Sequence, residues 1–161
     1  MKSETALTER GAVVSSKPPI GYIEVRVFAH ATEDPEKVLT AIRNLLPVEV
    51  GEGVVFRKTQ LSGHHGNPIV LFEVKLTDKH LLPAVLQKIG AGLTRFDKEQ
   101  LGCDIKMHLE KRNLFLRFDK QSAFQGKARF SQNDPIHFKV HFKDKSFEEI
   151  VVFCSDARLL P

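Results

Sequence analysis

The alternation of apolar and polar residues between Ile136 and Lys143 constrains the fold of this chain most. Ile136, Phe138, Val140 and Phe142 alternate with His137, Lys139, His141 and Lys143. Successive side chains of a β-strand point to opposite faces, so this pattern predicts a strand with one buried face and one exposed face. The exposed face would carry basic and titratable side chains.

Similar patterns divide the rest of the chain. Alternation predicts strands at 20–30, 54–61, 69–76, 105–110 and 114–119, with residues 120–126 breaking the pattern. Apolar residues at helical spacing predict helices at 35–46, from a cap at Asp78 to Leu93, and from 147 to 154, with a short helical turn at 95–101. This order predicts an α+β fold, an antiparallel sheet with helices packed on one face. We expect one domain at 19–161 and a disordered tail at 1–18.

Local signals support several of these boundaries. Asp34 is a natural N-cap with Pro35 at the first helical position, and Pro47 ends the same helix. Ser146 and Glu149 have the spacing of a capping box. The glycines and proline of 62–68 predict a longer hairpin loop between two strands.

The excess of positive over negative charge lies in one part of the chain. Residues 106–145 hold ten Lys or Arg and four acidic residues, whereas residues 1–105 hold thirteen of each. The predicted sheet would add to this concentration on its uncovered face, which we expect to carry Glu24, Arg26, Glu73, Lys75, Lys106, His108, Arg117, His137, Lys139, His141 and Lys143. Such a surface is suited to a polyanion, although a solvated face that serves solubility explains the same pattern.

Two segments are candidates for RNA contact. The first is the predicted basic hairpin and loop of residues 106–129, which we call the basic segment. Its Lys and Arg side chains can neutralise phosphates, Gln121 can bond to base edges, and Phe124 can stack on an unpaired base. A core position for Phe124 is the stronger alternative, and Asp119 is expected to cap a turn or pair with a neighbouring cation. In the 63–67 loop, polar side chains can hydrogen-bond to phosphate or bases. The alternative is that this loop is a turn that only connects two strands. The candidate residues are Lys111, Arg112, Arg117, Lys120, Gln121, Phe124, Lys127 and Arg129, with His64, His65 and Asn67.

Other classes of function have weaker support in the sequence. The seven histidines lack ligand-like spacing, so we expect no metal, no other cofactor and no catalytic centre. Cys103 and Cys154 are expected to be small buried residues. No apolar run is long enough to span a bilayer, so a cytoplasmic location without membrane partners is expected.

Three motifs resemble a known family. They are Thr32-Glu33-Asp34 with Lys37-Val38, the 63–69 loop Gly-His-His-Gly-Asn-Pro-Ile, and the 116–126 stretch Leu-Arg-Phe-Asp-Lys-Gln-Ser-Ala-Phe-Gln-Gly. In this order they resemble the archaeal family of RNA-binding proteins and predicted exosome subunits.

The resemblance implies a fold similar to that of the large-subunit ribosomal protein that binds 5S RNA. It also implies a role in RNA processing or ribosome assembly, with exosome or RNase P components as partners, and it assigns no catalytic residue. We therefore expect a non-catalytic protein that binds structured or ribosomal RNA. The alternative is a protein-interaction subunit of such a complex whose basic face docks an acidic partner.

Overall fold

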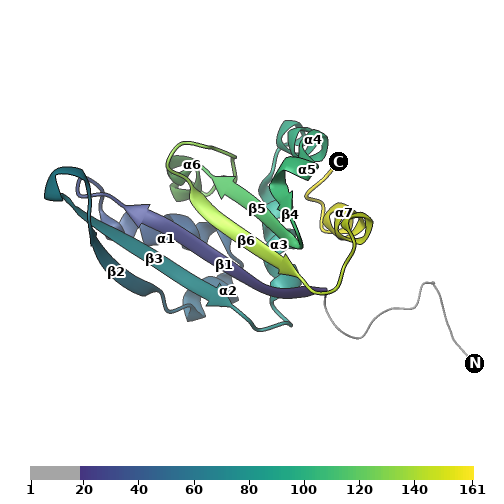
Figure 1. Cartoon of the computed structure of the whole chain (residues 1–161), viewed down its shortest axis with the longest axis horizontal. Helices are drawn as coiled ribbons and strands as arrows, with labels where there is room; N and C mark the ends of the chain where they lie inside the picture. Colours follow the sequence, from purple (N-terminus) through teal and green to yellow (C-terminus); the bar gives the residue numbers. More distant parts are fainter. Residues whose placement is uncertain (1–18) are drawn as a thin grey trace, which may run out of the picture.

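The segment with the cleanest alternation forms strand β6, in which every second residue is buried. The computed structural model describes residues 19–161, so the predicted tail at 1–18 lies outside the described residues. All strand pairs are antiparallel, and the strands lie in the order β2-β3-β1-β6-β5-β4 (Figure 1). The strands are β1 (Ile20–Ala29), β2 (Arg57–Ser62), β3 (Pro68–Leu76), β4 (Leu109–Glu110), β5 (Asn113–Phe118) and β6 (Ile136–Phe142).

Helices cover one face of this sheet, which confirms the predicted α+β architecture. In Figure 1 the first and third helices lie behind the sheet, and the fourth, fifth and seventh gather at one end of it. The helices are α1 (Pro35–Leu45), α2 (Val48–Gly53), the 3-10 turn η1 (His64–Gly66), α3 (Leu82–Gly92), α4 (Arg95–Cys103), α5 (Ile105–His108), α6 (Lys120–Phe124) and α7 (Phe147–Asp156).

The core lies between the sheet and these helices. Val25 and Val27 of β1 and Phe138 of β6 are fully buried on the covered face. Phe118 of β5 packs edge-on against Phe138, with ring centroids 5.3 Å apart. Because side chains alternate along each strand, this buried face fixes which residues of the same strands point away from the helices.

The predicted capping signals are confirmed. The Asp34 side chain accepts the backbone N–H of Glu36 at the start of α1, and Pro35 occupies the first turn. Ser146 and Glu149 form the expected capping box of α7. These caps satisfy backbone donors that have no partner inside the helix.

One predicted strand is largely helical in the structure. The strand expected at 105–110 is a helical turn, α5, followed by the two-residue β4. Ile105 and Leu109 are four residues apart, so a helical turn also places them on one side, and Met107 between them is 84% exposed. An alternation over only six residues therefore does not distinguish a strand from a helical turn.

Other differences concern the helices, namely where α3 begins and which short helices form. Asp78 accepts the N–H of His80 in a turn, and α3 begins only at Leu82. Two short helices were missed: α2, and α6 inside the stretch where the alternation stops.

The two cysteines have different environments. Cys154 is buried, as expected, and burial raises the pKa of its thiol to about 12. Cys103 is exposed, so its expected burial is wrong. It is the last residue of α4, where the chain turns out of the helix.

Within residues 19–161, no helix is both long and apolar enough to cross a membrane.

Gly90 is required where α3 meets the turn that follows α7. A Cβ atom at this position would lie 2.4 Å from the carbonyl oxygen of Ala157. We expect Gly90→Ala to lower the free energy of unfolding by about 1–3 kcal/mol, because backbone must shift to accept the methyl group. Urea denaturation measures this change. Gly53→Ala is the matched control, since no heavy atom lies within 4 Å of a Cβ there; an equal loss in both variants would contradict the packing argument.

Candidate nucleic-acid interface

The face of the sheet opposite the helices is rich in cations. On it, Arg26 of β1 is paired in register with Glu73 of β3 and with His137 of β6. His137 is in turn paired with Arg117 of β5. The expected positions of most charged residues on this face are thus confirmed, but Lys106 and His108 lie on α5 and were placed on it wrongly.

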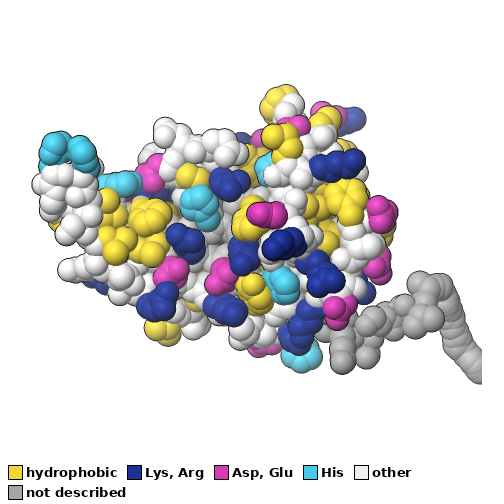
Figure 2. Space-filling view, in the orientation of Figure 1, with side chains coloured by type: hydrophobic (Ala, Val, Ile, Leu, Met, Phe, Trp, Pro, Cys, Tyr) yellow, Lys and Arg dark blue, Asp and Glu magenta, His cyan; other side chains and the backbone are white. Residues whose placement is uncertain are grey.

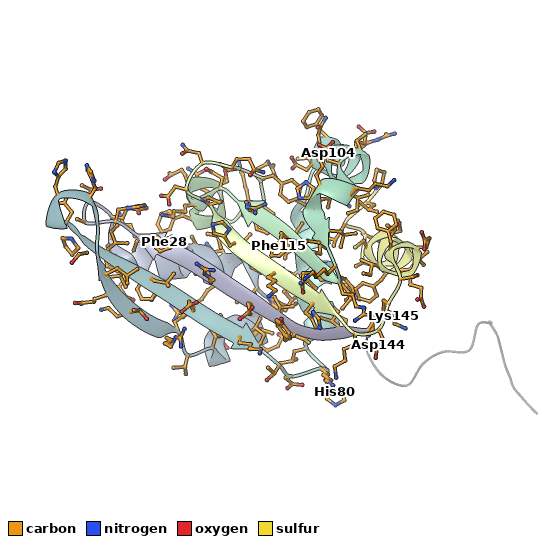
Figure 3. All side chains as sticks on the ribbon, viewed as in Figure 1. Phe28, His80, Asp104, Phe115, Asp144 and Lys145 are labelled. Atoms are coloured by element: carbon orange, nitrogen blue, oxygen red, sulfur yellow. The ribbon has the colours of Figure 1, made fainter. Side chains whose placement is uncertain are left out.

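Aromatic side chains share the same face. Tyr22 and Phe28 lie on β1 and Phe115 lies on β5, and all three are partly exposed. Figure 3 labels Phe28 and Phe115 at separate positions across the sheet. Aromatic rings on an open sheet are the surfaces on which unpaired bases stack in sheet-based RNA-binding modules.

Tyr22 is the centre of a cationic cluster. Its ring stacks on His141 with centroids 4.8 Å apart. The ammonium of Lys75 lies 4.3 Å from the centroid of the Tyr22 ring, and that of Lys139 lies 5.7 Å from it. Such distances allow cation–π attraction.

Two further cations lie near this cluster, Lys143 just after β6 and Arg112 in the β4–β5 turn. The backbone N–H of Phe142 donates to the carbonyl of Arg112, and that of Lys143 donates to the carbonyl of Pro19. These bonds hold the β4–β5 turn and the residues after β6 beside the start of β1. In Figure 2, Lys and Arg side chains gather where β6 ends. We call this group the Tyr22 patch: Tyr22, His141, Lys75, Lys139, Arg112 and Lys143.

Gly21 makes room for the patch. A Cβ atom there would lie 3.1 Å from Cδ2 of His141 and 3.2 Å from Cγ of Lys143. The pairing of β1 with β6 is also irregular between Ile20 and Tyr22. The glycine and the irregular pairing together let both side chains lie close to β1.

The patch keeps His141 neutral. Burial is the main cause that lowers the pKa of His141, and Lys139, Arg112, Lys143 and Lys75 lower it further. Nδ1 of the ring donates to Oδ1 of Asn113 at 2.8 Å. The cluster is therefore positive through its Lys and Arg side chains, and the neutral ring offers a flat stacking surface.

Part of the positive charge on this face is balanced. Lys139 lies 3.6 Å from a carboxylate oxygen of Glu24, and Glu73 pairs with Arg57 and Arg26. The neighbouring His137 has a pKa lowered by burial, then by Arg117 and Arg26. The cations of neighbouring strands are thus separated by the carboxylates of Glu24 and Glu73 and by two imidazoles whose lowered pKa favours the neutral form.

The predicted RNA-contact residues fall into four separate places. Lys111 and Arg112 form the β4–β5 turn, and Arg117 lies on the open face. The residues from Lys120 to Arg129 lie around α6. The 63–67 loop is the exposed tip of the β2–β3 hairpin. The seven residue steps of β3 from Pro68 to Lys75 span roughly 23 Å, and the tip extends beyond Pro68, so the loop lies on the order of 30 Å from the Tyr22 patch.

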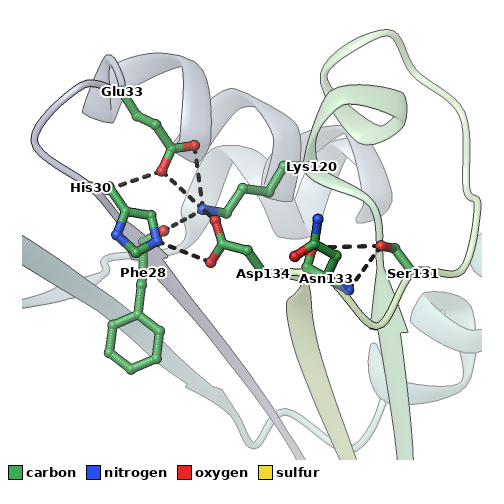
Figure 4. A network of polar contacts seen from close by, with 7 residues as sticks. All are labelled: Phe28, His30, Glu33, Lys120, Ser131, Asn133 and Asp134. Carbon is green, nitrogen blue, oxygen red and sulfur yellow. Dashed lines mark hydrogen bonds and ion pairs between the residues drawn. The ribbon is translucent and has the colours of Figure 1, made fainter.

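Lys120 has a structural role that differs from its predicted one. Its side chain is only 13% exposed, so the expectation that it lies at the surface is wrong. Its ammonium donates to the carbonyl of Phe28 at 2.6 Å and pairs with Glu33 at 3.0 Å and Asp134 at 2.8 Å (Figure 4). An ammonium held in this way is not free to neutralise a phosphate.

The same cluster has the composition of a cation site. Among the described residues, His30, Glu33 and Asp134 form the one group of three possible metal ligands, with ligand atoms within 4.8 Å of one another. The Lys120 ammonium lies against both carboxylates, so the positive charge that a metal would bring is already supplied. Burial by itself would raise the pKa of Asp134, but the hydrogen bonds from Lys120 and His30 hold it below its usual value.

The remaining residues around α6 have mixed roles. Phe124 is 40% exposed, so it does not fill the core as expected; Ala123 is the buried residue of α6. Asp119 caps α6 by accepting the backbone N–H of Ser122, as expected. Arg129 donates to the carbonyls of Ala128 and Gly92, while Lys127 is exposed.

Sequence reasoning missed Tyr22 and Lys75 as members of a site. Both residues occupy outward positions of predicted strands, and Lys75 was placed on the open face. Their proximity depends on the pairing of β1 with both β3 and β6, which a charge count along the chain does not contain.

The fold and this face define an α+β protein with an open basic and aromatic sheet. A family model described as RNA binding matches residues 22–142, more than half of the chain. An RNA-binding protein of Pyrococcus abyssi is 33% identical over 124 residues, which cover 75% of this chain and 80% of the relative. An uncharacterized protein of Methanocaldococcus jannaschii is 31% identical over 138 residues, with 80% and 91% covered.

A solved structure agrees with these matches. A DUF54 protein from Methanothermobacter thermautotrophicus superimposes with a TM-score of 0.69 at 26% identity, over 88% of this chain and 98% of its own. The chain therefore belongs to this RNA-binding family. The expected exosome role and the likeness to the ribosomal protein stay predictions.

Replacing Lys120 tests its role as an ion-pair centre. We expect Lys120→Met to lower the free energy of unfolding at pH 7 by about 2 kcal/mol, because two carboxylates would face each other without a cation; their partial exposure keeps the loss below that of a fully buried pair. Asp134 has a folded pKa below its unfolded value of about 3.9, so its stabilising contribution exists above that pH and is lost as the pH falls through the folded pKa.

The difference between parent and variant should therefore shrink from pH 7 to about pH 2, as measured by urea denaturation. Lys88→Met, which removes an exposed lysine of α3, is the control and should change stability by less than about 0.5 kcal/mol. A Lys120 variant as stable as this control would disprove the structural role.

Proposed function

We propose that this protein binds structured RNA without catalysis, and that the RNA lies on the open face of the sheet over the Tyr22 patch. The observation that carries the proposal is the convergence of four cations, from two strands and two turns, on one stacked aromatic pair. A solvated face needs no such convergence, because scattered charges serve solubility equally well.

The chemistry of the patch suits both parts of a nucleotide. Lys75, Arg112, Lys139 and Lys143 can neutralise phosphates and release counterions. Tyr22 can stack on an unpaired base, and Phe115 offers a second ring on the neighbouring side of β6. Arg117 extends the positive surface along β5, and Lys111 extends it beyond the β4–β5 turn.

Lys127 and Arg129 have a smaller part in RNA binding here than their place in the basic segment suggested. Both lie near α6, and Arg129 already donates to two carbonyls. The three motifs shared with the archaeal family support a role in RNA processing or ribosome assembly, with exosome or RNase P components as partners. Electrostatic docking of an acidic protein on the same face is the alternative that the experiment below separates from RNA binding.

Binding to the patch should depend steeply on salt. Four phosphate contacts give a slope of log K on log salt of about −3 to −4. Lys75→Ala, Arg112→Ala and Lys143→Ala should each weaken binding broadly across RNA sequences and reduce the slope by about 1. Tyr22→Ala should weaken binding about fivefold or more with the slope unchanged. Fluorescence anisotropy with a labelled RNA stem-loop measures both quantities.

Lys88→Ala is the control for these variants, because it removes one exposed charge on the helical side. Binding that is flat in salt would favour the docking of an acidic protein. Variants that fold and bind RNA like the control would remove the patch from the proposal. Recovered RNA should stay intact after incubation with Mg²⁺, Mn²⁺ or Zn²⁺, and cleavage abolished by a single substitution would contradict the non-catalytic part.

The 63–67 loop enters the proposal as a second contact at the far end of the face. His64, His65 and Asn67 are exposed there. The roughly 30 Å between loop and patch is close to one turn of a double helix, so only an RNA of that length or more can reach both.

We therefore expect His65→Asn and Asn67→Ala to weaken the binding of a duplex of about fifteen base pairs, and to leave a stem-loop with a short stem unaffected. Asparagine is chosen for His65 because the residue has φ 60°, a conformation that Asn tolerates. Anisotropy with RNAs of both lengths measures this. Equal effects on both lengths would contradict the two-contact arrangement.

A further inference from the structure

A groove lies between α6 and the start of α1. The groove has a volume of about 420 Å³, within the range of small-molecule sites. Its walls combine one aromatic ring with amide, carboxylate and ammonium groups. They are formed by Thr32, Glu33, Asp34, Lys37, Val38, Ala41, Lys120, Gln121 and Phe124.

Phe124 is an exposed ring on a fixed backbone. Nδ2 of Asn44 donates to the carbonyls of Ala123 at 3.0 Å and of Phe124 at 3.1 Å, which ties the end of α6 to α1. The Lys37 ammonium lies 5.9 Å from the centroid of the ring. A ring that is exposed, pre-positioned and flanked by a cation can stack on a base without first becoming ordered.

Both walls of the groove are held in place. Asp119 caps α6, and Lys120 connects α6 to Glu33 and to the end of β1. Lys120 also balances the charge of Glu33, so the groove is less acidic than its carboxylates alone would make it. A rigid groove of this kind selects a ligand by the pattern of its hydrogen-bonding groups.

We propose that this groove binds one unpaired guanine of the RNA, with Phe124 stacked on the base. On the loop side of the groove, Glu33 is engaged by Lys120 and by the backbone N–H of His30, so the acceptor for a base is the Asp34 carboxylate, whose Oδ1 also accepts the N–H of Glu36. A carboxylate matches two adjacent donors, and guanine is the base whose Watson–Crick edge has N–H and NH₂ groups side by side. Gln121 and Lys37 supply donors for its carbonyl oxygen. Adenine, cytosine and uracil would each bring at least one acceptor against the carboxylate. This inference rests on the proposed RNA binding and adds base selection to it.

The test uses a labelled RNA stem-loop whose uridine-rich loop contains one variable unpaired nucleotide. The parent protein should bind the guanosine loop at least about fivefold more tightly than the adenosine, cytidine and uridine loops. Phe124→Ala should weaken binding of the guanosine loop about fivefold or more with an unchanged salt slope, because it removes no charge. Phe96→Ala, which removes another exposed ring, 66% exposed on α4, is the control and should bind like the parent.

Asp34→Asn tests the carboxylate separately. Asparagine is also a good N-cap, so α1 should stay intact by circular dichroism while the preference for guanosine falls. Gln121→Ala should reduce the same preference.

If the four loops bind equally well and Phe124→Ala binds like Phe96→Ala, while binding stays steeply salt-dependent, the guanine site is overturned and RNA binding on the sheet face stands. Loss of salt-dependent RNA binding by the parent would overturn both proposals.

Discussion

The register of β1 against its two neighbours is the constraint on which the rest of this structure depends. β1 is paired through residues 23–29 with β3 on one side and through residues 20–26 with β6 on the other. Its inward residues, such as Val25 and Val27, are fully buried, so a shift by one residue would expose them and bury the outward set. Burial of the core thereby sets the place of Tyr22 between Lys75 and Lys139. Hydrophobic packing on one face determines the chemistry of the other.

The open face brings cations of neighbouring strands close together. Like charges across neighbouring strands destabilise a sheet, and here the strands meet with Glu24 and Glu73 between the cations. His137 and His141 add little to the repulsion, because their lowered pKa values favour the neutral imidazole. Binding of phosphates would relieve the repulsion that is left, which links the local strain of the unbound face to its affinity for a polyanion.

Alternation in the sequence was enough to predict the long strands, the covered face and most outward residues, because a period of two has one structural meaning over seven or more residues. It failed at 105–110, where Ile105 and Leu109 satisfy helix and strand equally. The basic segment correctly predicted a cationic surface, but it did not predict where on the molecule that surface lies. Its members reach the open face, the β4–β5 turn and α6, since β5 and α6 diverge after Phe118. Lys120 was misplaced because its partners Phe28 and Glu33 are 92 and 87 residues away along the chain.

The two-residue length of β4 has a consequence for how other macromolecules approach. The outer side of β5 beyond β4 is closed by His108, whose ring contacts the Phe115 carbonyl, and by backbone bonds between Arg117 and Ser131 and between Asp119 and Arg129. At the opposite edge, β2 is polar and carries Arg57 and Lys58. Sheets guarded in this way resist the addition of a foreign strand. Strand addition is therefore disfavoured at both edges, and the broad surface of the sheet, rather than its edges, is the place where a large ligand meets side chains of several strands.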